Sequence, residues 1–225
     1  MKPIVTADKA VEDIQSGSSL MVAGFMGCGN ACTLIDALLR KGSKDLTLIT
    51  SDTAFPDIGV GRLVCQNRVK KLVATHIGTN PVVGQKMNAG ELDVTLVPQG
   101  TFNERIRARG AGLGGVLTPT GIGTAVEKGK EKLAIEGQIY LLELPLGAEF
   151  AFVKAEVCDT HGNCFLPMST KNAAVSMAMA ADRVFVEAEK VVQPGELDPE
   201  KVTIPGVFIS AIVQSTLPAE NLQRK

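Results

Sequence analysis

The chain has 225 residues, of which 45% are hydrophobic and 21% are charged, and its formal net charge is −1. This composition is typical of a globular protein with a full hydrophobic core and excludes an intrinsically disordered chain. A balanced charge and only 4% aromatic residues provide neither the basic surface nor the stacking platforms that nucleic acids require. We therefore expect no nucleic-acid partner.

In the first half of the chain, short apolar runs typical of buried strands alternate with helical patterns. The expected strands are Ser19–Ala23, Leu46–Thr50, Val69–Thr75 and Val94–Pro98. The expected helices are Ala7–Gln15, Cys32–Arg40, Pro81–Met87 and Thr101–Ala108. This alternation predicts an α/β fold with a mostly parallel sheet and helices on both of its faces.

The second half has a different pattern, with pairs of strands joined by turn residues. Glu136-Gly137 divides Lys132–Leu144 into one antiparallel hairpin, and Gly162-Asn163 divides Phe150–Leu166 into another. A helix over Asn172–Ala181, a strand over Arg183–Glu187 and a proline-rich, loop-rich tail from residue 194 complete the prediction. We therefore expect one α/β domain over residues 1–225 with antiparallel β additions.

The N-terminal segment and the longest apolar stretch of the sequence bear on localisation. Acidic residues at positions 8, 12 and 13 interrupt the N-terminal segment, so no signal peptide is expected. The longest mostly apolar stretch, Leu20–Gly29, is far shorter than the ~20 residues that span a bilayer. These features predict a cytoplasmic protein without a membrane partner.

The sequence contains five cysteines, which is an odd number, and no two of them form a C-x-x-C pair. A disulfide framework is therefore improbable. Two of them, Cys158 and Cys164, flank His161. This group is either part of a zinc site or a β-hairpin with a Gly-Asn turn. Because a structural zinc needs four ligands and no fourth ligand follows, we expect no metal.

A glycine-rich segment, residues 23–29, joins the first predicted buried strand to the following helix. Backbone N–H groups at such a junction, together with the helix dipole, favour an anion such as a phosphate or a forming oxyanion. Segments 76–81 and 110–124 are further loops of this kind. Loops that follow parallel strands meet at the carboxyl edge of the sheet, where ligands bind.

A dinucleotide is one alternative ligand, because Asp52 ends the second strand where a ribose-binding acid would lie. The glycine spacing G-x-x-G-x-G argues against it, since Cys32 stands where a third glycine is needed. A second alternative is a stand-alone module that binds an anion or a sugar phosphate, as an isomerase or a sensor does. Such a protein would carry its own acid or base and need no partner chain.

Motifs across nearly the whole chain favour a different class. In chain order they are Val22-Ala-Gly-Phe-Met-Gly-Cys-Gly, Asp45-Leu-Thr-Leu-Ile with Ser51-Asp52-Thr53, His76-Ile-Gly-Thr-Asn-Pro81, Leu96-Val-Pro-Gln-Gly-Thr101, Gly112-Leu-Gly-Gly-Val-Leu-Thr-Pro-Thr-Gly121, and Cys158-Asp-Thr with Gly162-Asn163. In these motifs the chain resembles the α subunits of class I coenzyme A transferases. Within that family it is most similar to the short-chain acetate, butyrate and acetoacetate enzymes.

The resemblance implies an enzyme that moves coenzyme A (CoA) from an acyl-CoA to a free carboxylate in two half-reactions. A glutamate attacks the thioester, the CoA thiolate attacks the resulting anhydride, and a glutamyl-CoA thioester remains. The second acid then reverses the sequence. The family's glutamate lies in an S-E-N-G motif of the β subunit, whereas this chain has only the pair Glu220-Asn221 without the glycine.

The chain therefore resembles the half without the nucleophile, and no catalytic residue is expected in it. The resemblance assigns CoA binding to Ala23, Gly24, Phe25, Met26, Gly27, Cys28 and Gly29. The wall of the active site is expected to include Asn80, Gln99, Gly114 and Gly115. The implied partner is a β subunit, in a heterotetramer or a larger α/β assembly. No cofactor is implied, because the CoA thioester is a substrate.

The chain departs from the family pattern in the glycine loop. Ala23 replaces a glycine, and Asn30-Ala31 stands where Thr-Pro is typical. These departures bear on substrate choice rather than on the fold.

Overall fold

The computed structural model describes residues 1–216. Its main sheet has nine strands in the order β1-β12-β11-β9-β2-β3-β4-β5, and β10 pairs with β9 outside this path. The strands of this sheet are β1 (Ile4–Val5), β2 (Ser19–Val22), β3 (Leu46–Thr50), β4 (Val69–Ala74), β5 (Asp93–Leu96), β9 (Ala148–Asp159), β10 (Cys164–Phe165), β11 (Ala181–Val192) and β12 (Ala211–Gln214). All pairs along the path are parallel, and only β10 is antiparallel. The predicted parallel sheet with an antiparallel addition is confirmed.

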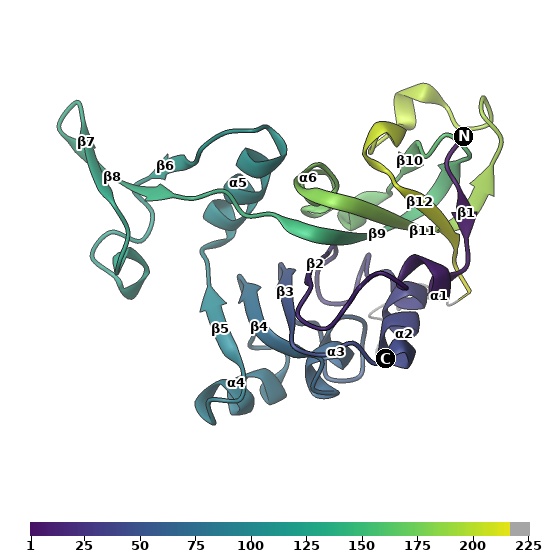
Figure 1. Cartoon of the computed structure of the whole chain (residues 1–225). Coiled ribbons are helices and arrows are strands. Elements are labelled where there is room, and N and C mark those ends of the chain that lie inside the picture. The colour runs from purple at the N-terminus through teal and green to yellow at the C-terminus, as the bar shows by residue number, and fades with distance from the viewer. Residues whose placement is uncertain (217–225) are drawn as a thin grey trace.

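Helices cover both faces of this sheet (Figure 1). They are α1 (Ala7–Ala10), α2 (Cys32–Lys41), α3 (Gly61–Cys65), α4 (Pro81–Asn88), α5 (Gln99–Gly110) and α6 (Ala174–Ala180). Side chains of a strand alternate between the faces, so Leu20 and Val22 of β2 join the core under α2, and Met21 joins the core under α5 and α6. Two hydrophobic cores therefore enclose the sheet, as the alternating pattern predicts.

Helix α2 shows why the sequence folds in this way locally. Its Leu34, Ile35 and Leu38 are fully buried, whereas Arg40 is exposed. The helix ends at Gly42, whose φ of 84° lets its N–H bond to the Leu38 carbonyl.

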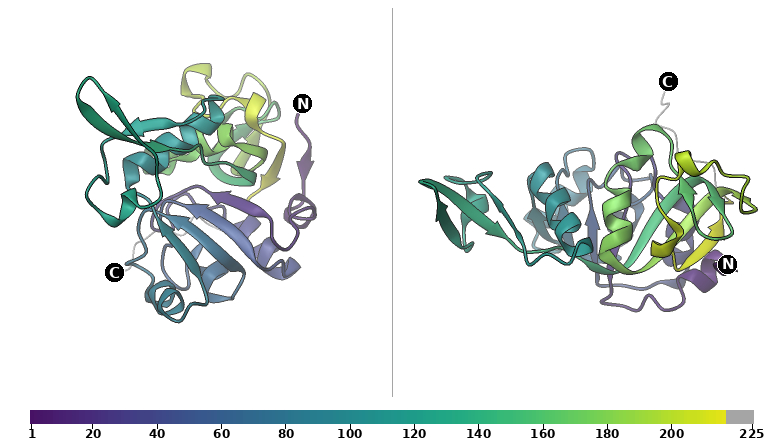
Figure 2. Two further views of the ribbon diagram at one scale, coloured as in Figure 1. Left: turned by 60° about the vertical axis from the view of Figure 1, so that its left-hand side comes forward. Right: turned by 90° about the horizontal axis from the view of Figure 1, so that it is seen from above.

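A second sheet of three antiparallel strands, in the order β6-β8-β7, projects from the body as an arm (Figures 1 and 2). The strands are β6 (Val116–Thr118), β7 (Lys132–Ile135) and β8 (Gln138–Glu143). Glu136 and Gly137, with φ of 51° and 80°, form the two-residue turn that such hairpins favour. The predicted hairpin and its turn are confirmed.

The root of the arm is fixed by charged groups. The Glu143 carboxylate is buried and pairs with Lys130. Arg105 of α5 lies 3.8 Å from the same carboxylate and donates from Nε to the Leu144 carbonyl at 2.7 Å. The arm is thereby attached to the helix that leads from the main sheet.

Several predicted boundaries were wrong. The helix expected over Ala7–Gln15 ends at Ala10, because the chain then turns through bonds to carbonyls three residues back, such as Ile14 N to Val11 O. The tail expected to be loop-rich contains β12, which is held by pairing with β11 and β1 rather than by local preference. The strand expected over Arg183–Glu187 extends over the twelve residues of β11, because β11 pairs in parallel with β9 from Ala181 to Val192.

Candidate active site

The loops that follow β2, β3 and β4 meet at the carboxyl edge of the main sheet, where the sequence predicts a site. The glycine loop after β2 is closed by two hydrogen bonds of 2.9 Å between the backbones of Phe25 and Cys28. The residues between them, Met26 and Gly27, have φ of 52° and 85°, as in a tight hairpin turn. Three donors of the loop are thus used within the protein, since Met26 N also donates to Asp52 Oδ1 at 3.0 Å.

Gly24 cannot be replaced in this loop without displacing its neighbours. Its φ is +115°, and a Cβ atom there would lie 2.5 Å from Asn30 Nδ2 and 2.6 Å from the Cys28 carbonyl oxygen. The Asn30 amide occupies this space because it holds the loop together. It donates to the Ala23 carbonyl at 2.9 Å and accepts from Val60 N at 2.9 Å. Asn30, noted in the sequence only as a departure from the family pattern, is thus the residue that joins both ends of the loop.

Asp52 supports the tip of the glycine loop from below. Its side chain is fully buried and accepts hydrogen bonds from Met26 N and Ala54 N, at 3.0 and 3.2 Å. Burial raises the pKa of this carboxyl, and the two N–H donors and His76 oppose the rise. A buried and occupied carboxylate is not a ribose ligand, so the structure does not favour the dinucleotide alternative.

We expect the raised pKa of Asp52 to appear in the pH dependence of stability. A carboxyl whose folded-state pKa exceeds the unfolded value of 3.8 stabilises the fold most below that value, and the contribution is lost as the pH rises through the folded pKa. Relative to the Asp52→Asn variant, the free energy of unfolding of the wild type should therefore fall as the pH rises from about 4 and then level off. Urea unfolding of both proteins between pH 4 and 7 measures this. A wild type that gains stability over the variant with rising pH would show that the carboxyl is not penalised by burial.

An open pocket of about 420 Å³ lies beside the glycine loop and is lined by Phe25, Gln99, Ser169 and Asn172. Phe25 is 39% exposed in it. Gln99 begins α5, and its side-chain oxygen lies 2.6 Å from the Thr75 hydroxyl at the end of β4. The pocket is thus an apolar surface with amide and hydroxyl groups at its border.

Asn172 connects the pocket to the glycine loop. Its Nδ2 lies 3.5 Å from the Gly24 carbonyl oxygen and 3.4 Å from Ser51 Oγ. The helix expected over Asn172–Ala181 begins only at Ala174, because Ala173 adopts a left-handed φ of 50°. This backbone break frees Asn172 to reach the loop.

The other residues expected in the active-site wall lie apart from this pocket. Asn80 is buried beneath the loop after β3, where its Nδ2 lies 3.4 Å from the Thr53 carbonyl oxygen. Gly114 and Gly115 lie at the root of the arm, and a Cβ atom on Gly115 would lie 2.9 Å from the Glu143 carbonyl oxygen. Of the four expected wall residues, Gln99 alone is among the residues that line the pocket. A contact of the other three with substrate stays a prediction.

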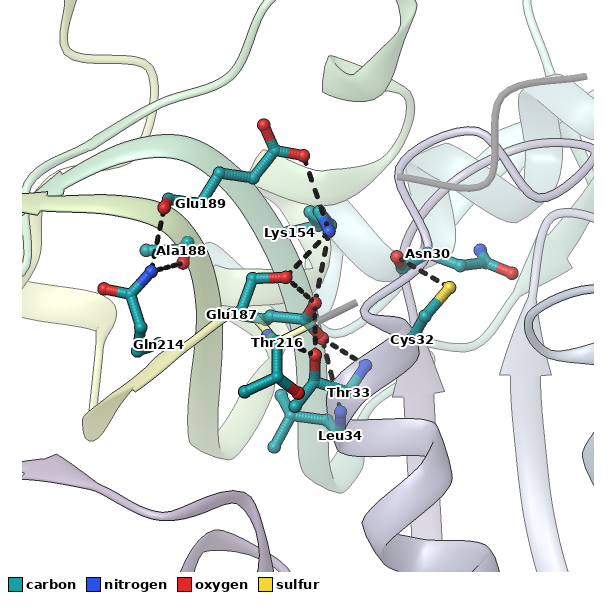
Figure 3. Close-up of polar contacts among 11 residues, drawn as sticks. Asn30, Cys32, Thr33, Leu34, Lys154, Glu187, Ala188, Glu189, Gln214 and Thr216 are labelled. Carbon is teal, nitrogen blue, oxygen red and sulfur yellow. Dashed lines mark hydrogen bonds and ion pairs between the residues drawn. The ribbon is translucent and has the colours of Figure 1, made fainter. Parts of the chain in front are cut away.

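The sequence indicates an anion at the start of the helix after the glycine loop, and the structure places one of the protein's own there (Figure 3). The carboxylate of Glu187 on β11 accepts from the N–H groups of Thr33 and Leu34 at 2.8 and 3.2 Å. It also accepts from the Thr33 hydroxyl at 3.0 Å and from the Ser215 hydroxyl at 2.6 Å. Lys154 Nζ, on the neighbouring strand β9, lies 3.1 Å from the same carboxylate. The N-terminus of α2 is therefore neutralised internally and fixes the glycine loop to the middle of the sheet.

The cysteines are placed as follows. Cys158 and Cys164 face each other across the β9–β10 hairpin with their sulfurs 3.5 Å apart. The Cys158 sulfur and burial raise the pKa of the Cys164 thiol above its usual range. The hairpin interpretation of this segment is confirmed.

Cys28 Sγ lies 3.6 Å from Ser169 Oγ beside the pocket. Within residues 1–216, no cluster of three acidic, histidine or cysteine side chains is arranged to hold a metal ion.

Comparison with known proteins defines the class of this fold and site. The family model described as Coenzyme A transferase matches residues 4–215, so the chain belongs to the coenzyme A transferase family. The chain is 49% identical over 212 residues to the acetate CoA-transferase subunit alpha of Escherichia coli (strain K12), covering 94% of this chain and 96% of the relative. It is 50% identical over 200 residues to the acetoacetyl-CoA:acetate/butyrate CoA transferase alpha subunit of Clostridium acetobutylicum, covering 89% and 92% of the two chains.

Solved structures agree with this assignment at the level of the fold. The acyl-CoA transferase YdiF of Escherichia coli O157:H7, in a thioester complex with CoA, has a TM-score of 0.85 at 24% identity. The match covers 95% of this chain and 47% of that one. Glutaconate coenzyme A-transferase from Acidaminococcus fermentans has a TM-score of 0.84 at 19% identity, covering 95% of this chain and 76% of the other. The alternative of a stand-alone sugar-phosphate module is not favoured by these matches. The Glu220-Asn221 pair lies outside the described residues.

Proposed function

We propose that this chain is the α subunit of an enzyme that transfers coenzyme A from a short-chain acyl-CoA, such as acetoacetyl-CoA or butyryl-CoA, to a carboxylate such as acetate. The observation that carries the proposal is the pocket beside the glycine loop, in a chain that belongs to this family. Among residues 1–216, its lining consists of an aromatic ring, two amides and a hydroxyl, without a carboxylate. A transferase that works through a glutamyl thioester must then receive its glutamate from another chain.

The roles of the residues follow from this division. The glycine loop, residues 23–29, brings backbone close to CoA, and the apolar floor beside Phe25 accepts a short acyl chain. The Gln99 side chain, whose oxygen is held by the Thr75 hydroxyl, donates from its nitrogen to the thioester oxygen, which becomes an oxyanion when the carbonyl is attacked. Asn172 holds the glycine loop beside it through the Gly24 carbonyl. The partner is a β subunit, in a heterotetramer or larger assembly. No resident cofactor is required, because CoA enters and leaves as part of the substrates.

The chemistry of the proposed cycle balances without any other reactant. A glutamate carboxylate on the β subunit attacks the thioester carbon. The CoA thiolate is released, and an acyl-glutamyl anhydride is formed. The thiolate then attacks the glutamyl carbonyl and releases the first acid. The second acid reverses both steps.

No helix within residues 1–216 is long and apolar enough to cross a bilayer. We propose that the assembly acts in the cytoplasm.

We expect the purified chain alone to show no CoA exchange between acetoacetyl-CoA and acetate. Addition of the purified β subunit should restore the exchange. Incubation of the complex with acetoacetyl-CoA in the absence of an acceptor acid should leave CoA covalently bound to the β subunit, visible in its intact mass. Substantial exchange by the isolated chain, or CoA bound to this chain instead, would overturn the proposed division of the active site.

A further inference from the structure

The two faces of the arm differ in what covers them. The strand register places Leu117, Leu133, Ile135, Gln138, Tyr140 and Leu142 on one face. We call this set the bare face. Five of its six side chains are hydrophobic or aromatic, none is charged, and none is buried. Leu117 is 40% exposed and Ile135 is 43% exposed.

The opposite face of the arm is covered by the protein itself at its root, whereas Ile139 near its tip is 43% exposed. Its Leu141 is fully buried, and its Glu143 pairs with Lys130 from the segment between β6 and β7. That segment folds over this face, because a Cβ atom on Gly121 would lie 2.6 Å from Val126 and 3.6 Å from Leu141. The chain therefore buries the root of one face, whereas no residue of the bare face is buried along its length.

We propose that the bare face is a docking surface for the β subunit, an inference that rests on the proposed function. A three-stranded sheet gains its stability from an apolar face that is packed against another element. The uncharged bare face calls for an apolar partner surface, such as a sheet or helix face without charges, since a charge buried there would have no counter-ion.

The size of the bare face argues against a dimer of this chain that is joined through this face alone. A stable interface uses roughly 20–30 residues on each side, whereas the bare face has six residues. Two copies joined only through this face would lack the area for a stable dimer. The partner on the bare face must therefore contact the body of the protein as well.

The β subunit already has to contact the body, because it brings the glutamate to the pocket beside Phe25. Helix α5 connects the two places. It begins at Gln99 in the pocket and ends at Gly110, next to the arm, and its 12 residues extend about 18 Å at 1.5 Å per residue. A second chain of similar size, with a radius of gyration of roughly 17 Å, can contact both at once.

The test is the affinity of the reconstituted complex, measured from the two purified subunits by analytical ultracentrifugation. Ile135→Glu places a charge on the bare face and should raise the dissociation constant at least about 10-fold. Leu117→Glu, on a different strand of the same face, should have the same effect. Ile139→Glu is the matched control, because Ile139 is also 43% exposed but lies on the opposite face of β8. We expect it to change the dissociation constant less than about 3-fold.

Limited trypsin digestion at Lys128, Lys130 and Lys132 shows whether the arm of each variant remains folded. An unchanged affinity of Ile135→Glu and Leu117→Glu, in a complex whose wild type exchanges CoA, overturns the docking surface and leaves the proposed function intact. A wild-type pair that neither associates nor exchanges CoA overturns both. If the isolated chain is a dimer that Ile135→Glu converts to a monomer, the bare face binds a second copy and the proposal is wrong.

Discussion

Replacing Gly24 by alanine is expected to abolish CoA exchange in the reconstituted enzyme, with a loss of at least about 100-fold in kcat/KM, since misplacement by an ångström far from the reacting atoms already has an effect of this order. The added methyl group would lie 2.5 Å from Asn30 Nδ2 and 2.6 Å from the Cys28 carbonyl oxygen. The Cys28 carbonyl belongs to the bond that closes the loop, so the loop must open to relieve the contact. Steady-state exchange assays and the affinity for CoA, measured by calorimetry, report the effect.

Gly17→Ala is the matched control for this substitution. Gly17 also has a positive φ, +89°, but a Cβ atom there meets no atom within 4 Å. The control should therefore lose only about 1 kcal/mol of stability from the left-handed backbone and keep its activity. Equal activity of the Gly24 and Gly17 variants would show that the shape of the glycine loop is not needed for exchange.

The second large effect is expected from Glu187→Ala, which should lower the free energy of unfolding by about 3–5 kcal/mol. The substitution leaves the ammonium group of Lys154 buried without its closest carboxylate and removes the acceptor of two N–H groups at the start of α2. Urea unfolding, followed by circular dichroism, measures the change.

Two variants distinguish a loss of stability caused by the unpaired buried charge from a loss caused by substitution in β11 as such. Glu189 lies 3.5 Å from the same Lys154 but is 41% exposed, so Glu189→Ala should change the stability by less than about 1 kcal/mol. The double variant Glu187→Gln with Lys154→Met removes both charges and should recover most of the loss, since no buried charge is then left without a partner and the new amide oxygen at position 187 can still accept from the N–H groups of α2. If the single and double variants are equally unstable, the charge pair is not the cause of the loss.

The parts of the fold that the sequence predicts best are those with a strong local signal. The run Leu46–Thr50 consists of leucine, isoleucine and threonine and has the same bounds as β3. The turn at Glu136-Gly137 combines residues that accept a positive φ. The core face of α2 follows from its leucine spacing alone. In these elements, local preference and tertiary structure agree.

Other elements depend on contacts that the sequence does not display. Helix α3 begins at Gly61, which packs so closely that a Cβ atom would lie 2.0 Å from the Phe55 carbonyl oxygen. Glu187 and Lys154 suggest exposed strand positions when they are considered singly, yet they are buried because they pair with each other across β9 and β11. The extent of β11 was underestimated because its outer residues are held by pairing with β9, up to Val192 opposite Asp159.

The candidate site likewise combines residues that sequence motifs predict with residues that only tertiary contacts place there. The glycine loop and Gln99 follow from motifs in the sequence. Ser169 has no comparable signal, because its place beside Phe25 depends on a segment 144 residues away along the chain folding over the loop. Asn30 was visible only as a departure from a family pattern, and Asn172 only as the first residue of an expected helix. Their hydrogen bonds to the loop give both residues a role that neither signal predicts.

The position of β2 at the centre of the sheet has a consequence for biosynthesis. β2 pairs with β3 on one side and with β9 on the other, and Leu20 lies opposite Phe150, 130 residues later. While a ribosome is still producing the arm, one edge of β2 has no neighbour. Such an exposed edge of apolar strand is a template for aggregation. A nascent chain that stalls before β9 should therefore depend on chaperones far more than one that has passed it.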